Sequence, residues 1–285
     1  MHDTIVQIQR IHNCSYIKTL SGGTSAFTCV LKKEGGEQMV GKIPFKNHDS
    51  ELEFKKEVDT LMLAHGVGYA KVLYVATQYE YVLLELLGKP LAAYKYSIEA
   101  QIEIIVGTLK EVWQAVEENT SEFVYPDAIL DWFQNFTISS WEDQNQPFSD
   151  TLKNKVEKAI AERRARIDPN HLVLIHGDAH NKNILKDNTN NENGFKFIDP
   201  DGIICEPAYD LAVLMREWID DLFPDYNNKL KQRLDYLTDL TACDPTAIWQ
   251  WTIIQLTATG LVLNSIDQHH AAKQMFQIAE NCEIA

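Results

Sequence analysis

Short apolar runs separated by turn residues characterise the first third of the chain and predict a small antiparallel sheet. Strand-like runs occupy residues 27–33 and 38–45, and the sequence Glu34-Gly35-Gly36-Glu37 between them is typical of a hairpin turn. Further runs of the same kind lie at residues 16–19, 72–75 and 81–87. We therefore predict five strands in this part of the chain.

One helix is expected inside this region. Ser50 and Glu53 have the spacing of a helix-start capping box. The residues that follow recur at helical intervals and form one apolar stripe, which consists of Phe54, Val58, Leu61 and His65. The helix should therefore pack this stripe against the sheet.

The pattern changes after Gly88-Lys89-Pro90, where apolar residues begin to recur every three or four positions. This spacing predicts a long core helix from Ile98 to Val116, a second helix from Pro207 to Leu222, and a third that starts at Asp244-Pro245. We therefore expect an α+β fold with two lobes. Residues 1–88 would form the smaller lobe, and residues 89–285 the larger, mainly helical lobe.

Composition and charge narrow the function. The 285 residues are 45% apolar, which is enough to bury a substantial core, and their formal net charge is −15. Such an acidic chain is a poor partner for nucleic acid, whereas a cationic small molecule would be attracted to it. We expect a small cationic ligand and no nucleic-acid partner.

Neither a membrane segment nor a disulfide framework is expected. The N-terminus has no signal-peptide pattern, and the apolar stretch 251–263 is too short and too polar to span a bilayer. The five cysteines are odd in number, far apart and without a Cys-x-x-Cys pair, which is typical of reduced thiols. These features predict a cytoplasmic protein.

The candidate chemistry lies in His176-Gly177-Asp178-Ala179-His180-Asn181-Lys182-Asn183 and in Asp199. The intervals between Asp178, Asn183 and Asp199 are those of a kinase, in which the first carboxylate accepts the proton of the substrate hydroxyl and the other two side chains hold magnesium. Apolar runs at residues 172–175 and 195–198 read as two strands that end beside these groups. The pattern therefore predicts phosphoryl transfer from a nucleotide.

Two other interpretations use the same residues. Asp178 and Asn183 could simply shape a turn, since Asp, Asn and Gly favour turns for backbone reasons. Alternatively, His176, Asp178 and His180 alternate along the chain and could bind zinc or another hydrolytic metal from one side of a strand. A metal-dependent hydrolase thus stays an alternative.

The motif His176-Gly177-Asp178 resembles that of the aminoglycoside phosphotransferases, a family of small-molecule kinases built like protein kinases. The segments Ile198-Asp199-Pro200-Asp201-Gly202 and Glu206-Pro207-Ala208-Tyr209-Asp210-Leu211-Ala212 look most like the branch of streptomycin and hydroxyurea kinases. Asp201 departs from the pattern of that branch. The resemblance implies a protein-kinase-like fold with a nucleotide-binding N-terminal lobe, ATP and Mg²⁺ as cofactors, and an aminoglycoside such as streptomycin as acceptor.

Relatives of this shape also act on choline, methylthioribose or homoserine, so these acceptors stay open. A nucleotide-binding protein without catalysis is a further alternative.

The resemblance also assigns nucleotide-binding roles. It makes Ser21-Gly22-Gly23-Thr24-Ser25 the loop over the phosphates and residues 85–87, with the backbone of Glu85 and Leu87, the hinge that binds the base. Val40 and Lys42 lie on one face of a strand, so Val40 should contact the base and Lys42 the phosphates. Glu57 on the inward face of the first helix is the expected ion-pair partner of Lys42, with Glu53 as the fallback.

The remaining assignments concern the loop and the acceptor. In related kinases, the residue at the position of Asp210 braces the catalytic loop, and His176 supports the same loop. Carboxylates that follow Asp210 on the second helix, or lie near the C-terminus, could bind a cationic substrate. The candidates are Glu217, Asp220 and Asp221 on that helix and Glu280 near the C-terminus.

Overall fold

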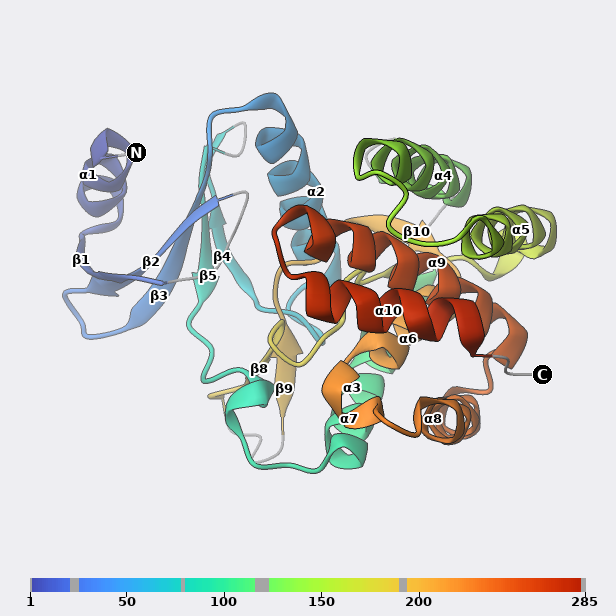
Figure 1. Cartoon of the computed structure of the whole chain (residues 1–285). Helices are drawn as coiled ribbons and strands as arrows, with labels where there is room; N and C mark the ends of the chain where they lie inside the picture. Colours follow the sequence, from blue (N-terminus) through green and yellow to red (C-terminus); the bar gives the residue numbers. More distant parts are fainter. Residues whose placement is uncertain (1, 21–25, 78–79, 116–122, 190–193, 283–285) are drawn as a thin grey trace. The chain divides into compact units, whose positions relative to one another are not determined.

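The computed structural model describes residues 2–20, 26–77, 80–115, 123–189 and 194–282 (Figure 1). The chain divides into two compact units. Unit 1 comprises Met1–Lys95, Thr108–Val112 and Asn181–Gly202, and unit 2 comprises Tyr96–Gly107, Trp113–His180 and Ile203–Ala285. The fold class is α+β, as predicted, whereas a lobe boundary after residue 88 stays a prediction.

The five predicted strands form one antiparallel sheet in unit 1. Its order is β1-β2-β3-β5-β4, and its strands are β1 (Cys14–Thr19), β2 (Ala26–Lys33), β3 (Gln38–Pro44), β4 (Val72–Val75) and β5 (Val82–Glu85). The β2–β3 hairpin turns at the predicted residues, and its register sets Val30 opposite Val40 and Thr28 opposite Lys42. The alternation of side chains therefore presents Val40 and Lys42 on the same face of β3.

An N-terminal helix that the sequence analysis did not predict packs against apolar residues of the sheet. Helix α1 (His2–His12) contributes Ile8, which is fully buried with Cys29, Leu31 and Met39. Ile5 is partly buried against the same residues, so one side of α1 packs on this core.

The helix expected after the hairpin is α2 (His48–Ala64), but it starts earlier than predicted. Asn47 is the N-cap residue, and its side-chain oxygen accepts a hydrogen bond of 2.9 Å from the Ser50 backbone N–H. A capping box that begins at Ser50 is therefore wrong, because Ser50 already lies in the first helical turn and supplies the bonded N–H. The helix ends at Ala64, and its C-cap residue His65 adopts the left-handed conformation.

A second hairpin completes unit 1. Strands β8 (Ile184–Lys186) and β9 (Phe195–Phe197) pair antiparallel. Backbone hydrogen bonds fasten β9 to the segment after α2, from Phe197 N–H to the Gly68 carbonyl and from Ala70 N–H to the Phe197 carbonyl, at 2.8 and 2.9 Å. Asn183 and Asp199, which flank this hairpin, are therefore held on the same unit as Lys42.

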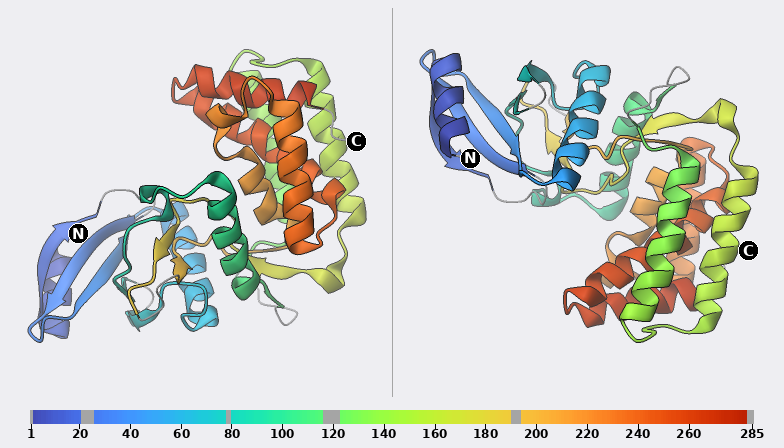
Figure 2. Two further views of the ribbon diagram at one scale, coloured as in Figure 1. Left: turned by 90° about the horizontal axis from the view of Figure 1, so that it is seen from below. Right: turned by 90° about the horizontal axis from the view of Figure 1, so that it is seen from above.

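Unit 2 is mainly helical. Strand β7 (Val173–Ile175) lies between β10 (Ile203–Cys205) and β6 (Gln114–Ala115). Helix α9 (Pro245–Ser265), which starts at Pro245 as predicted, is buried on almost every side from Ala247 to Leu261. It contacts the helices that surround it in Figures 1 and 2, which are α4 (Pro126–Asp143), α5 (Asp150–Arg166), α6 (Ala208–Arg216), α8 (Tyr226–Thr241) and α10 (His269–Asn281).

Two predicted helices are shorter than expected. Helix α3 (Ile98–Val112) stops before Gln114, where β6 begins. The helix predicted from Pro207 to Leu222 is wrong, because α6 ends at Arg216 and a separate short helix, α7 (Ile219–Leu222), follows. Trp218 between them has a φ of 53°, a left-handed conformation that interrupts the helical hydrogen bonds.

Two further features concern the helices and the cysteines. Among the described residues, none of the helices has the length and apolar character that crossing a bilayer requires. All five cysteines are free thiols.

Gly68 is required for the close packing of the segment after α2 against the end of α3, and Gly107 serves as the control position. Gly68 has a φ of 63°, and a Cβ there would lie 2.3 Å from Cγ1 of Val112, whereas a Cβ on Gly107 meets nothing within 4 Å. We expect Gly68→Ala to lower the free energy of unfolding by at least about 1–2 kcal/mol. Gly107→Ala, in the exposed middle of α3, should instead raise it by about 0.5–1 kcal/mol.

Chemical denaturation of both variants checks this pair. Equal stability of the two variants would contradict the role given to Gly68.

Candidate active site

Lys42 on β3 joins two carboxylates from distant parts of unit 1. Its Nζ lies 2.7 and 2.6 Å from the Oε1 and Oε2 atoms of Glu57 and 2.7 Å from Oδ1 of Asp199. Glu57 is buried on α2, while Glu53, the fallback partner, is exposed one turn earlier. The lysine is therefore paired with Glu57.

Burial makes this ion cluster a strong constraint. The side chains of Lys42 and Glu57 are each only 6% exposed. Loss of water would by itself lower the pKa of Lys42, but the charges of Glu57 and Asp199 raise it above the ordinary value, so the ammonium group stays charged. A cation in this place requires a nearby carboxylate, because an unpaired buried charge is strongly destabilising.

Asp199 also lies beside the second predicted metal ligand. It follows β9 with a φ of 57°, which Asp tolerates better than most residues, and its side chain is 41% exposed. The backbone carbonyl of Asn183, just before β8, accepts a hydrogen bond of 2.9 Å from Ile198 N–H. A carboxylate and an amide oxygen at neighbouring strand ends are ligands that suit a hard cation such as Mg²⁺.

A cavity of about 630 Å³ lies next to this cluster in unit 1. Four predicted nucleotide-binding residues line it, namely Val40, Lys42, Glu85 and Leu87, whereas the predicted loop Ser21–Ser25 lies outside the described residues. Sequence reasoning missed several other lining residues, among them Ile17, Leu20, Ala70, Leu84 and Ile198. Only Ile198 carried a usable signal, because it directly precedes Asp199.

Hydrogen bonds on both sides hold the end of β5 beside the cavity. The carboxylate of Glu85 accepts hydrogen bonds of 2.7 Å from the Lys71 backbone N–H and from Nζ of Lys196. Further along, Gly88 N–H donates to the Lys186 carbonyl at 2.7 Å. The Glu85 side chain thus has a structural role, and residues 85–87 are among those that line the cavity.

The loop that contains Asp178 belongs to unit 2, where Asp210 holds its backbone. The carboxylate of Asp210 is fully buried and accepts hydrogen bonds from the N–H groups of His176 and Gly177 at 2.9 and 2.8 Å. Nε1–H of Trp113 donates a third bond of 2.9 Å to the same carboxylate. Burial raises the pKa of Asp210, and the positive potential of His176 and these donated bonds oppose that rise.

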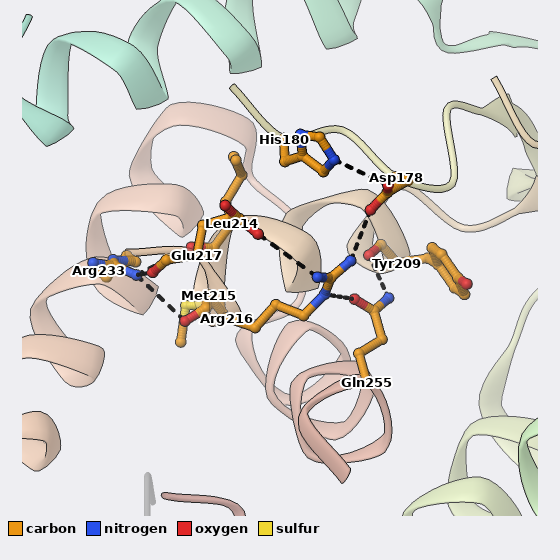
Figure 3. Close-up of polar contacts among 9 residues, drawn as sticks. All are labelled: Asp178, His180, Tyr209, Leu214, Met215, Arg216, Glu217, Arg233 and Gln255. Atoms are coloured by element: carbon orange, nitrogen blue, oxygen red, sulfur yellow. Dashed lines mark hydrogen bonds and ion pairs between the residues drawn. The ribbon is translucent and has the colours of Figure 1, made fainter. Parts of the chain in front are cut away.

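Asp178 itself is held by two basic side chains (Figure 3). Its Oδ1 accepts a bond of 2.8 Å from Arg216 at the end of α6, and its Oδ2 lies 3.1 Å from Nε2 of His180. Burial would raise the pKa of Asp178, but the His180 hydrogen bond and the charge of Arg216 hold it well below the usual range. Sequence reasoning did not single out Arg216, because the predicted helix continued to Leu222 and the end of α6 at Arg216 was not foreseen.

The hydrolase alternative finds no support in this geometry. Nδ1 of the buried His176 accepts a hydrogen bond of 3.1 Å from the backbone N–H of Asp178, which makes it part of the loop structure. The described part of the chain contains no group of three or more His, Cys, Asp or Glu side chains that could hold a metal ion.

The four candidate substrate carboxylates have different surroundings. Glu217 lies 3.6 Å from Arg216, so its charge is partly compensated. Asp220 and Asp221 are exposed on α7, and Asp221 lies 3.5 Å from Lys229. The structure therefore contradicts the expectation that these three residues share a helix with Asp210.

Glu280 lies apart on α10. It accepts a hydrogen bond from the hydroxyl of Ser149 and lines a separate cavity of about 440 Å³ with Phe148 and Phe276.

Comparison with known proteins places these features in a family. A family model described as aminoglycoside/hydroxyurea antibiotic resistance kinase matches residues 10–264. A comparison with curated protein sequences gave no match.

Several solved structures share the fold at low sequence identity. The choline kinase LicA from Streptococcus pneumoniae has a TM-score of 0.65 and 15% identity, and the match covers 98% of each chain. The GDP complex of aminoglycoside 2'-phosphotransferase-IIIa has a TM-score of 0.64 and 16% identity, covering 98% of this chain and 97% of that one. A choline kinase from Cryptosporidium parvum Iowa II reaches a TM-score of 0.66 at 15% identity, covering 98% and 94%.

The role of Asp210 predicts a loss of stability in Asp210→Asn. The amide cannot accept from all three donors, so a buried N–H group is left facing another N–H group, which costs about 1–3 kcal/mol. Asp235→Asn, on an exposed position of α8, is the matched control and should stay within about 0.5 kcal/mol of the unsubstituted protein. Urea unfolding measures both changes, and an Asp210→Asn variant as stable as the control would contradict the bracing role.

Proposed function

Because this chain belongs to the aminoglycoside/hydroxyurea antibiotic resistance kinase family, we propose that it transfers the γ-phosphate of ATP to a hydroxyl group of a small cationic substrate. An aminoglycoside such as streptomycin is the favoured acceptor. The observation that carries the proposal is the buried lysine with two carboxylates beside a cavity large enough for a nucleotide.

The cavity supports the nucleotide side of the reaction. Its apolar walls, with Val40 on one strand, would hold the base, and the backbone of residues 85–87 would bind the edge of the base. Lys42 would contact the phosphates, while Glu57 accepts a hydrogen bond from the ammonium group and so fixes its position. The loop Ser21–Ser25 is proposed to cover the phosphates.

Asn183 and Asp199 are the proposed Mg²⁺ ligands, since they offer oxygen atoms at neighbouring strand ends. When bound, magnesium neutralises charge on the phosphates. Asp199 already contacts Lys42 at 2.7 Å, so the carboxylate is held near the cation that would share the same phosphates.

Asp178 acts on the acceptor in this proposal. It orients the hydroxyl group, whose oxygen forms the new P–O bond while the bond to the ADP oxygen breaks, and the hydroxyl proton goes to the carboxylate. Phosphoryl transfer has a loose transition state, so orientation and charge neutralisation account for most of the catalysis. Asp210 and His176 serve to hold this loop.

The acidic character of the chain supports a cationic acceptor. The net charge of −15 raises the local concentration of cations, and the exposed Asp220 and Asp221 carry part of that charge close to the end of α6. We propose these two residues and Glu217 as acceptor contacts, with Glu280 as a separate candidate.

A panel of acceptors tests the proposal. Phosphate transfer from ATP would be measured with streptomycin, other aminoglycosides, choline, methylthioribose and homoserine, and we expect transfer to at least one aminoglycoside. Asp178→Asn should lower the turnover of that acceptor by about a hundredfold to ten-thousandfold and leave ATP affinity intact. Asp235→Asn again serves as the control. Transfer to none of these acceptors, or near-normal turnover of Asp178→Asn, would contradict the proposal.

The buried ion pair predicts a strongly non-additive double substitution. Lys42→Ala and Glu57→Ala should each lower turnover, and the double variant should lose much less than the sum, because the second change removes a residue whose partner is already gone.

Lys33 and Glu37 provide a matched pair for this experiment. They form an exposed ion pair of 2.9 Å on the β2–β3 hairpin, away from the cavity. Their alanine variants should keep full turnover, since exposed pairs contribute little. Additive losses at Lys42 and Glu57 would show that the two residues do not function as a unit.

A further inference from the structure

Arg216 has an unusual set of contacts for the last residue of a helix. Its side chain is only 15% exposed, and it lies 2.8 Å from Oδ1 of Asp178 and 3.6 Å from Glu217. A third contact, of 3.5 Å, joins its Nε to the side-chain oxygen of Gln255 (Figure 3). The guanidinium group is therefore enclosed between two carboxylates and an amide.

Gln255 fixes the guanidinium from the side of α9. It is buried in an otherwise mainly apolar helix, and its Nε2 donates a hydrogen bond of 3.0 Å to the Tyr209 carbonyl. A carbonyl can only accept, so this bond determines which end of the amide is the nitrogen. The oxygen end consequently faces Arg216.

Arg233 fixes the backbone next to Arg216. Its NH1 group donates to the carbonyls of Leu214, Met215 and Glu217 at 3.2, 3.3 and 2.7 Å, which are groups that the end of a helix leaves unpaired. The Arg233 guanidinium also lies 5.5 Å from the ring centre of Trp218, the residue that breaks the helix. The position of Arg216 is thus determined by two independent sets of contacts.

These contacts limit how the Asp178 carboxylate can turn. Arg216 takes one of its oxygens and His180 the other. A planar guanidinium group holds a carboxylate oxygen in a defined direction, which an ammonium group does not do. The remaining lone pairs of Asp178 therefore have a defined direction as well.

We propose that Arg216 is the positioning residue of the transfer reaction, and that it acts by holding the Asp178 carboxylate in the orientation that binds the acceptor hydroxyl. Gln255 and Arg233 support it from α9 and α8. This inference rests on the proposed function of Asp178 and adds a residue that lies outside the motif His176-Gly177-Asp178.

The first test is kinetic and uses the acceptor found in the panel. Arg216→Gln should lower kcat on the order of a hundredfold, the effect of a misplaced catalytic group, without changing the KM for ATP. Arg216→Lys keeps the charge but not the planar geometry, so its kcat should lie between those of Arg216→Gln and the unsubstituted enzyme. Arg164→Gln is the control and should leave kcat unchanged, because the contacts of Arg164 with the described residues are surface ion pairs to Asp127 and Asp131.

A double substitution separates positioning from a general structural effect. If Arg216 acts through Asp178, Arg216→Gln should cause little further loss in an Asp178→Asn background. A full additional loss in that background, or unchanged kcat in Arg216→Gln, would overturn the proposal. Should Arg216→Gln fail to fold, Arg216→Lys decides the question, and a kcat equal to that of the unsubstituted enzyme would overturn the proposal.

The second test needs no acceptor, so it separates this inference from the proposed function. The Asp178 carboxyl carbon can be followed by carbon NMR during a pH titration and identified by its absence in Asp178→Asn. Charged or titratable groups near this carboxylate are Arg216, His180 and His176. Loss of Arg216 should raise the pKa of Asp178, whereas Arg164→Gln should not change it. An unchanged titration in Arg216→Gln would overturn the proposal even if phosphate transfer had been found.

Discussion

The buried carboxylate of Asp210 is the interaction on which the arrangement of the loop in unit 2 depends. It lies near the start of α6 and accepts three hydrogen bonds, two of them from the backbone just before Asp178. Arg216, at the other end of the same helix, contacts the Asp178 side chain. The two residues are six positions apart, about 9 Å along a helix. One short helix therefore holds both the backbone and the side chain of the loop.

Ion pairs hold the candidate residues within each of the two units. In unit 1 one buried lysine is shared by two carboxylates, and in unit 2 one carboxylate is shared by an arginine and a histidine. Beside Lys42 the excess charge is negative, whereas the Arg216 guanidinium in unit 2 lies between the carboxylates of Asp178 and Glu217. A buried cation in unit 1 and a carboxylate held in its ionised form in unit 2 are each groups that phosphoryl transfer uses.

Comparison of the sequence with the structure shows where local patterns suffice. The alternation of apolar residues and the Gly-Gly turn located the β2–β3 hairpin, and Asp244-Pro245 located the start of α9, because turns and caps depend on a few adjacent residues. The start of α2 was misplaced, since Asn47 and Ser50 both suit a helix N-terminus and only the formed hydrogen bond distinguishes them. The break at Trp218 was missed because the apolar spacing continues through it.

The sequence by itself was enough to identify the candidate catalytic groups: the spaced Asp178, Asn183 and Asp199, the strand lysine Lys42, and the inward-facing Glu57. These residues also indicated the family. These features are local, set by side-chain periodicity along one strand or helix and by short motifs. Only the tertiary structure decided that Arg216 contacts Asp178, that Arg233 binds the carbonyl groups at the end of α6, and that a cavity lies beside Lys42. Those contacts join residues tens of positions apart, and the free energy that selects them comes from burying charges and helix ends, which no local pattern records.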